Sequence, residues 1–229
     1  MTGRYPTINY TEEGMREGMQ IEDENIPVRE KVELLDALSE TGLKEIVIGS
    51  FVSPKYPPQM ARIDEIVTKF TPKPGVGYYA LALNPKGVER AMQYAPPLTI
   101  VRGSGRPSLP VHQCDVFARR NTNRTQMQEM AAWQGVIDNA VATGAKEAGI
   151  GTNATFGSNY VGDFSVEMTM KFMEKQHELW DAVGITVTAV TIVDPMGWCH
   201  PVKVEEIFSQ VKKRWPKIKN FNAHLHNAR

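Results

Sequence analysis

The sequence predicts an α/β fold and, within that class, a (β/α)8 TIM barrel. Short apolar or β-branched runs alternate with longer amphipathic patterns along the 229 residues, and the composition does not change between them. About seven strand patterns, each but the last followed by a helix, fit such a barrel. The rival is a doubly wound sheet, which usually has a Gly-rich turn after its first strand. Here Arg16-Glu17 follows that strand, which favours the barrel.

The expected strands are apolar or β-branched runs that are bounded mainly by Gly and Pro. In chain order they are Thr7–Tyr10, Glu45–Val52, Val76–Leu83, Glu147–Thr152, Ile185–Val193 and Phe221–Leu225. A further strand comes from one or both of Leu98–Val101 and Pro110–Phe117, which flank the loop Gly103–Pro107. Because a barrel needs eight strands to close, we expect the C-terminal strand and helix to be missing, and residues 1–229 to be one incomplete catalytic domain.

The expected helices show apolar residues at spacings of three and four, with Gly or Pro near their ends. They are Val28–Thr41, Pro57–Phe70, Pro85–Tyr94, Arg124–Thr143, Ser165–Val183 and Pro201–Trp215. Gly42, Gly144 and Gly184 directly follow three of these patterns.

The charge balance argues against nucleic acid or a membrane surface as a partner, because 26 basic residues meet 26 acidic ones. Two cysteines cannot make a disulfide framework. Neither a signal peptide nor an apolar run long enough to cross a bilayer is found in the sequence. We therefore expect a cytoplasmic protein whose partner is a small-molecule substrate.

The strongest chemical pattern is His224-x-His226 on the last strand. Side chains two residues apart on a strand point to the same face, so both imidazoles can bind one metal ion. Glu17, which follows the first strand, would complete a set of two imidazoles and one carboxylate. Arg16 beside it suits a carboxylate or an enolate oxygen. The alternatives are a polar strand face for the histidines and a solvated surface pair for Arg16 and Glu17.

Other polar side chains follow strands that would end at the same mouth of a barrel. We expect Asp194 to be catalytic, with a turn cap as the alternative. The expected substrate-binding residues are Gln20, Ser50, Asn121 and Asn153. A catalytic Cys199 is less favoured, since its neighbour in sequence, His200, seldom makes a nucleophile–base pair. His112, Cys114 and His177 are expected to be structural.

Five segments resemble the hydroxymethylglutaryl-CoA lyase family, in the same order and with similar spacing. They are Gly14–Gln20, Ser50–Met60, Phe117–Asn123, Asp194–Gly197 and His224–Asn227. The second, Ser-Phe-Val-Ser-Pro-Lys ending in Pro-Gln-Met, is the most similar to the family's own motif. The superfamily also holds isopropylmalate and citramalate synthases and 4-hydroxy-2-oxovalerate aldolase.

The resemblance implies a TIM barrel with Mg²⁺ or Mn²⁺ bound by Glu17, His224 and His226, and with Arg16 stabilising an enolate. The implied activity is carbon–carbon bond cleavage in a 3-hydroxy acid or its CoA thioester, by a lyase or aldolase that we expect to be a homo-oligomer. Two alternatives stay open. One is a Claisen-type acyltransferase similar to isopropylmalate or citramalate synthase, and the other is a non-catalytic barrel that acts as a binding partner.

Several positions depart from the family pattern. Glu17 replaces a metal-binding Asp, and Val47 stands where the lyases have a Glu near the metal. Asp23 replaces a Lys that helps to hold the CoA chain, which puts a CoA thioester in doubt. Trp198–His200 is bulkier than the corresponding turn, and Asn227 replaces an Asp. Glu17 is therefore where the chemistry of this protein is most expected to differ.

Overall fold

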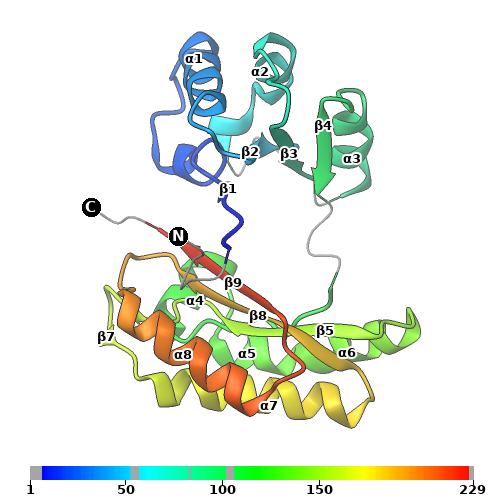
Figure 1. The fold of residues 1–229 in the computed structure, drawn as a ribbon, viewed down its shortest axis with the longest axis vertical. Helices are drawn as coiled ribbons and strands as arrows, with labels where there is room; N and C mark the ends of the chain where they lie inside the picture. Colours follow the sequence, from blue (N-terminus) through cyan, green and yellow to red (C-terminus); the bar gives the residue numbers. More distant parts are fainter. Residues whose placement is uncertain (1–6, 53–56, 83, 102–105, 227–229) are drawn as a thin grey trace. The chain divides into compact units, whose positions relative to one another are not determined.

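The computed structural model describes residues 7–52, 57–82, 84–101 and 106–226. The chain divides into two compact units, residues 1–105 and residues 106–229, and each unit contains its own parallel sheet. Both are drawn in Figure 1, and each is described by itself below. The predicted α/β class with parallel strands is confirmed.

The N-terminal unit is a four-stranded parallel sheet with helices between the strands. The strand order is β1-β2-β3-β4, so neighbours in sequence are neighbours in the sheet. The strands are β1 (Thr11–Glu12), β2 (Glu45–Ser50), β3 (Gly77–Leu81) and β4 (Leu98–Val101). The helices are η1 (Gly18–Ile21), α1 (Val28–Ser39), η2 (Pro58–Met60), α2 (Ile63–Lys69) and α3 (Pro85–Met92).

The core of this unit lies between the sheet and helices α1 and α2. Leu35 of α1, Ile48 of β2 and Ile63 of α2 are completely buried in one apolar cluster. Tyr78 of β3 joins this cluster, and its hydroxyl donates to Ser39 Oγ at 2.8 Å. The polar end of this aromatic side chain is therefore satisfied inside the core.

The C-terminal unit contains a second parallel sheet in the order β5-β8-β9. These strands are β5 (Glu147–Thr152), β8 (Thr186–Asp194) and β9 (Asn220–Leu225). A short antiparallel hairpin joins β6 (Gly157–Ser158) to β7 (Gly162–Asp163). The helices are α4 (Asp115–Thr122), α5 (Gln126–Ala131), α6 (Trp133–Ala142), α7 (Val166–Ala182) and α8 (Pro201–Arg214).

Helices α6, α7 and α8 supply side chains to one core with this sheet, and α7 and α8 pack against each other (Figure 1). Their ends follow from local sequence. Ser165 caps α7 by accepting from the Met168 amide at 3.2 Å, and Gly184 adopts a positive φ of 72° just after it. Pro201 occupies the first turn of α8, where no amide is needed.

Residues 107–113 run along the free side of β5 as an irregular extra strand. Parallel bridges join Ser108 to Gly149 and His112 to Asn153. Between these bridges, Gln176 of α7 completes the hydrogen bonding. Its Nε2 donates to the carbonyls of Leu109 and Gly151, each at 2.8 Å, and its Oε1 accepts from the Gly151 amide at 2.8 Å. One buried side chain thereby joins both strands to the helix.

The expected helix Pro57–Phe70 is instead the short 3-10 helix η2 followed by α2, which begins at Ile63. Three further sequence-based element boundaries were wrong. The first strand is Thr11–Glu12 and not Thr7–Tyr10, because Ile8 and Tyr10 are each 70% exposed and have no core to face. The expected helix Arg124–Thr143 is two helices, since Thr125 caps α5 and the helix is interrupted at Ala132.

The last of these wrong boundaries concerns Pro110–Phe117, where the extended segment ends at Gln113. Cys114 accepts from the Phe117 amide and starts α4. The loop residues Gly103–Gly105, and Ser53–Tyr56 of the second family-like segment, lie outside the described residues. Closure into a barrel and the single-domain boundaries stay predictions. Among the described residues, no helix is long and apolar enough to cross a membrane.

We predict that Gln176→Leu lowers the free energy of unfolding of the C-terminal unit by about 3 kcal/mol or more. The reason is that it leaves buried backbone groups of two strands unsatisfied, at about 1–3 kcal/mol each. All four tryptophans lie in this unit, so denaturant unfolding followed by their fluorescence measures the effect. Gln210→Leu, on the exposed face of α8, is the control, and equal stability of the two variants would contradict the prediction.

Candidate metal and substrate site

The turn after β1 fixes the predicted Arg16-Glu17 pair in the N-terminal unit. The Gly14 amide donates to Glu12 Oε1 at 2.6 Å, and a Cβ at Gly14 would lie 2.7 Å from the same oxygen. Met15 is only 1% exposed and anchors the turn in the apolar core. Arg16 and Glu17, next in the chain, are half-buried at the edge of this core.

Arg16 lies between two carboxylates. Its Nε contacts Glu13 Oε2 at 2.6 Å, and a terminal nitrogen contacts Glu17 Oε1 at 2.5 Å. Burial lowers the pKa of the guanidinium, but the hydrogen bonds and charges of Glu13 and Glu17 outweigh it, so the net pKa is raised. The side chain is therefore a permanent cation in a fixed orientation.

The other two predicted residues of this unit differ in exposure. Ser50, the last residue of β2, is 2% exposed. The side chain of Gln20 is exposed, while its backbone carbonyl accepts from Gln59 Nε2 at 3.2 Å. Their substrate-binding roles stay predictions.

His224 and His226, the two predicted metal ligands of the C-terminal unit, are held by the pairing of β9 with β8. His224 is opposite Val193 in the register, and the His226 amide donates to the Asp194 carbonyl at 3.2 Å. Phe221 packs edge-on against Phe208 of α8, with ring centroids 5.3 Å apart. Since side chains alternate along a strand, His224 lies on the face opposite α8.

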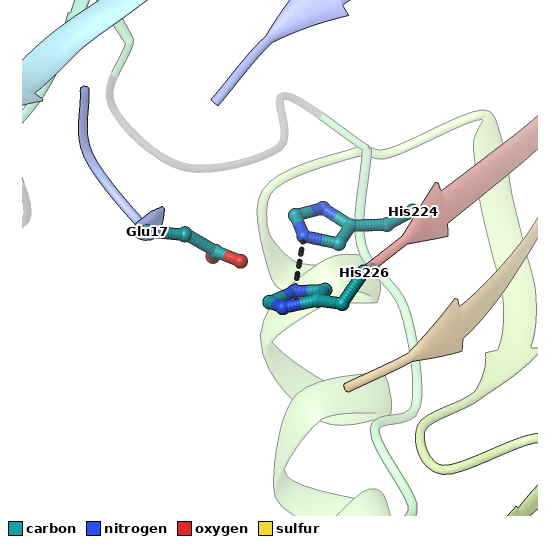
Figure 2. Close-up of side chains that lie close together, drawn as sticks. All are labelled: Glu17, His224 and His226. Carbon is teal, nitrogen blue, oxygen red and sulfur yellow. Dashed lines mark hydrogen bonds between the residues drawn. The ribbon is translucent and has the colours of Figure 1, made fainter. Parts of the chain in front are cut away.

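The imidazole rings of His224 and His226 face each other, as Figure 2 shows. Their Nε2 atoms are 3.0 Å apart. An octahedral ion with ligands at about 2.1 Å would hold two adjacent ligand nitrogens about 3.0 Å apart. The separation therefore fits the two nitrogens to one divalent cation, as the His-x-His spacing predicts.

Asp194 lies completely buried at the end of β8. Its carboxylate caps the turn that follows the strand, which is the alternative to a catalytic role. Its two carboxylate oxygens accept from the amides of Trp198, at 3.0 Å, and Cys199, at 2.6 Å. Trp198 Nε1 in turn donates to Asn159 at 2.7 Å. The carboxylate thus fixes the turn 195–199, and its catalytic role stays a prediction.

Asn121 lies in α4, which follows the extended segment 107–113, and Asn153 follows β5, along which that segment runs. Asn153 bridges His112, and its Oδ1 accepts from the Ala154 amide at 2.7 Å. Ala154 has a φ of 51°, an uncommon conformation for a residue with a side chain. Asn121 Nδ2 lies 3.1 Å from His112 Nε2.

Glu129 is the buried partner that sequence reasoning missed. It is 5% exposed, and its carboxylate contacts Nδ1 of His112 at 2.7 Å. The signal was available in the sequence, because Glu129 falls on the stripe of Trp133, Ile137 and Ala140, which the fold buries. A charged residue at a buried helix position usually has a partner.

The fold, the paired histidines and the motif order agree with a comparison of the sequence with protein families. The HMGL-like family matches residues 7–229, and the chain belongs to it. This confirms the family that the sequence motifs indicated.

The individual relatives share at most about a third of their residues with the chain over long alignments. The chain is 27% identical over 221 residues to mitochondrial hydroxymethylglutaryl-CoA lyase of Gallus gallus, covering 96% of this chain and 69% of that protein. It is 30% identical over 221 residues to the Mus musculus enzyme, covering 96% of this chain and 63% of the relative.

A solved HMG-CoA lyase of Acinetobacter baumannii, in complex with coenzyme A and 3-methylmalate, is structurally similar to the chain. The TM-score is 0.58 at 26% identity, covering 94% of this chain and 65% of the solved one. This chain thus spans about two thirds of the length of these proteins.

We predict that Cys199 is chemically inert near neutral pH. Burial, followed by the hydrogen bond and charge of Asp194, raises the pKa of its thiol from 9.0 to about 11. The thiolate fraction is then about a hundredfold smaller than for an ordinary thiol with a pKa of 9.0. The rate at which iodoacetamide alkylates Cys199 in a Cys114→Ser background measures this thiolate fraction. A rate at pH 8 equal to that of a free thiol would contradict the raised pKa, and Asp194→Asn should speed the reaction.

Proposed function

We propose that this protein is a divalent-metal-dependent carbon–carbon lyase or aldolase that cleaves a 3-hydroxy acid or its CoA thioester through an enolate, as hydroxymethylglutaryl-CoA lyases do. The observation that carries the proposal is the pair of imidazole nitrogens of His224 and His226, 3.0 Å apart at the end of β9. The family match over residues 7–229 supports the reaction class.

The proposal includes a (β/α)8 barrel. Both parallel sheets support it, because their strands follow in sequential order, β1-β2-β3-β4 in one unit and β5-β8-β9 in the other. A doubly wound sheet would reverse its strand order at a switch point. In a barrel the polar residues at the carboxyl ends of strands would line one mouth.

The family resemblance implies Mg²⁺ or Mn²⁺ as the bound ion. We assign His224 and His226 as nitrogen ligands and Glu17 as an oxygen ligand, an assignment that for Glu17 follows from its place in the Gly14–Gln20 motif. Two imidazoles and one carboxylate leave positions for substrate oxygens. When bound, such an ion polarises a substrate oxygen and stabilises negative charge on an adjacent one.

The residues of the chain have separate tasks in the proposed cleavage. A base removes the proton of the substrate's 3-hydroxyl group, and that electron pair forms a carbonyl. The carbon–carbon bond breaks, and its electron pair passes to the departing enolate. Arg16, a fixed cation with a fork of N–H donors, stabilises the enolate oxygen. We also assign a catalytic role to Asp194, at the end of β8, whose carbonyl accepts from the His226 amide.

The substrate contacts are assigned to side chains whose amides or hydroxyls can bond a carboxylate or hydroxyl. They are Gln20, Ser50, Asn121 and Asn153. We also propose that the enzyme works as a homo-oligomer in the cytoplasm. The exposed Asp23, which accepts from the Asn25 amide and side chain at 2.9 Å each, marks the point where CoA recognition would differ from the lyases.

We predict that His224→Ala and Glu17→Ala each weaken Mn²⁺ binding by at least about tenfold, because each removes a ligand from the ion. Titration calorimetry of the full chain measures the affinity. His177→Ala is a matched control, since His177 stacks on Trp215 with ring centroids 5.1 Å apart and has no assigned ligand role.

Glu13→Ala is the corresponding control for Glu17, because it also removes a carboxylate that contacts Arg16. It should weaken Mn²⁺ binding less than Glu17→Ala does, since it loses no ligand of the ion. Unchanged Mn²⁺ affinity in both His224→Ala and Glu17→Ala would disprove the assigned ligand set.

The enolate role makes a separate prediction about Arg16. Arg16→Met should lower kcat for cleavage of hydroxymethylglutaryl-CoA by about 10²–10³-fold, the usual effect of removing one donor that stabilises a developing oxyanion. The circular dichroism spectrum should stay as in the unmodified protein, and kcat is compared at saturating Mn²⁺, because Arg16 also contacts the proposed ligand Glu17. Full turnover by this variant would rule out Arg16 as the stabilising cation.

A further inference from the structure

We propose that His112, held by Glu129, sets the amide orientation of Asn121 and so determines which kind of group Asn121 can bind. The inference rests on the proposed function in one respect, the substrate-binding role of Asn121. The three side chains form a chain of contacts, from Glu129 Oε1 to His112 Nδ1 at 2.7 Å and from His112 Nε2 to Asn121 Nδ2 at 3.1 Å.

The buried end of this chain has a fixed polarity. Glu129 and His112 are each about 5% exposed, and the carboxylate accepts two further hydrogen bonds. These come from the His112 amide at 2.9 Å and from Thr122 Oγ1 at 3.0 Å. The same Oε1 that faces Nδ1 accepts from Thr122 Oγ1, so we assign the proton of the contact with the ring to Nδ1 of His112.

The position of the proton at Nδ1 also decides whether Nε2 of His112 donates or accepts a hydrogen bond. A neutral imidazole protonated at Nδ1 has an acceptor at Nε2. Asn121 therefore turns its amide nitrogen to His112 and its oxygen away from the ring. A ligand meets a hydrogen-bond acceptor at Asn121 Oδ1, which suits a substrate hydroxyl or an amide N–H. The His112 side chain thus acts as a positioning residue and does not itself touch the ligand.

The ring has little freedom to take another orientation. Phe117 packs against it edge-on with ring centroids 5.4 Å apart, and Gln126 Nε2 donates to the His112 carbonyl at 2.6 Å. The backbone of His112 is further held by its bridge to Asn153 at the end of β5. Because the His112 ring is held in place, a variant that changes which ring nitrogen carries the proton tests the inference more directly than one that moves the ring.

Glu129→Gln reverses the polarity while keeping the number of hydrogen bonds. The Gln oxygen can accept from the His112 amide, and its nitrogen can donate to His112 Nδ1 and to Thr122 Oγ1. Thr122 can take this bond because its own hydroxyl proton can go to the Ala118 carbonyl at 2.9 Å. His112 would then carry its proton at Nε2, and Asn121 would have to flip its amide and present nitrogen to the ligand.

The first experiment records two-bond ¹H–¹⁵N spectra of the full chain with ¹⁵N-labelled histidine. Five histidines give five ring patterns, and the His112 pattern is assigned by its loss in His112→Gln. We expect protonation at Nδ1 in the unmodified protein and at Nε2 in Glu129→Gln. Protonation at Nε2, or at both nitrogens, in the unmodified protein would overturn the inference. Glu167→Gln, an exposed carboxylate on α7, controls for the lost charge and should change neither pattern.

The second experiment measures KM and kcat for hydroxymethylglutaryl-CoA in a double-mutant cycle of Glu129→Gln and Asn121→Ala. We expect each single change to raise KM about tenfold, the effect of one lost hydrogen bond. The double variant should be no worse than Asn121→Ala, because the effect of Glu129 passes through Asn121. Additive effects would overturn the positioning role. Failure of the proposed function would instead appear as no turnover by the unmodified protein, and the ring spectra would then decide the inference alone.

Discussion

The pairing of β8 with β9 is the contact on which the candidate metal site depends. The register places His224 opposite Val193 and brings the His226 amide to the Asp194 carbonyl. A shift of one residue would turn both imidazoles to the face that packs on α8. β8 is also paired with β5 along its other side, so this central strand supports both the histidines and the end of the strand that leads to Asn153.

Much of the fold could be predicted because parallel α/β units have strong periodic signals. Glu147–Thr152 was predicted with the observed bounds, and α1, α7 and α8 were predicted to within two residues at each end. The errors arose where tertiary contacts decide the conformation. Residues 7–10 have strand-forming side chains but no core to cover them, and 107–113 relies on Gln176 from a distant helix for part of its hydrogen bonding.

The candidate site could be predicted in kind but not in its supporting contacts. The prediction from His-x-His needs only the alternation of side chains along a strand. The Nε2 atoms of His224 and His226 do lie on one side, 3.0 Å apart. Sequence alone could not pair Glu129 with His112, since the whole of helix α4 and the start of α5 lie between them. Nor could it show that Asp194 accepts from the amides of the turn that follows it, because that depends on how residues 195–199 fold back.

The strand pairs of the two sheets lie on either side of residue 101, so the strands of the first sheet are synthesised first. β4 pairs with β3, whereas 107–113 pairs with β5, so every strand pair described in the first sheet lies within the first 101 residues. Domains generally fold as units and N-terminal first during synthesis, at about 5–20 residues per second. The first sheet can therefore assemble on the ribosome before β9, which bears the histidines, has been translated. The strands that support Arg16 and Glu17 are thus synthesised before the imidazoles of His224 and His226.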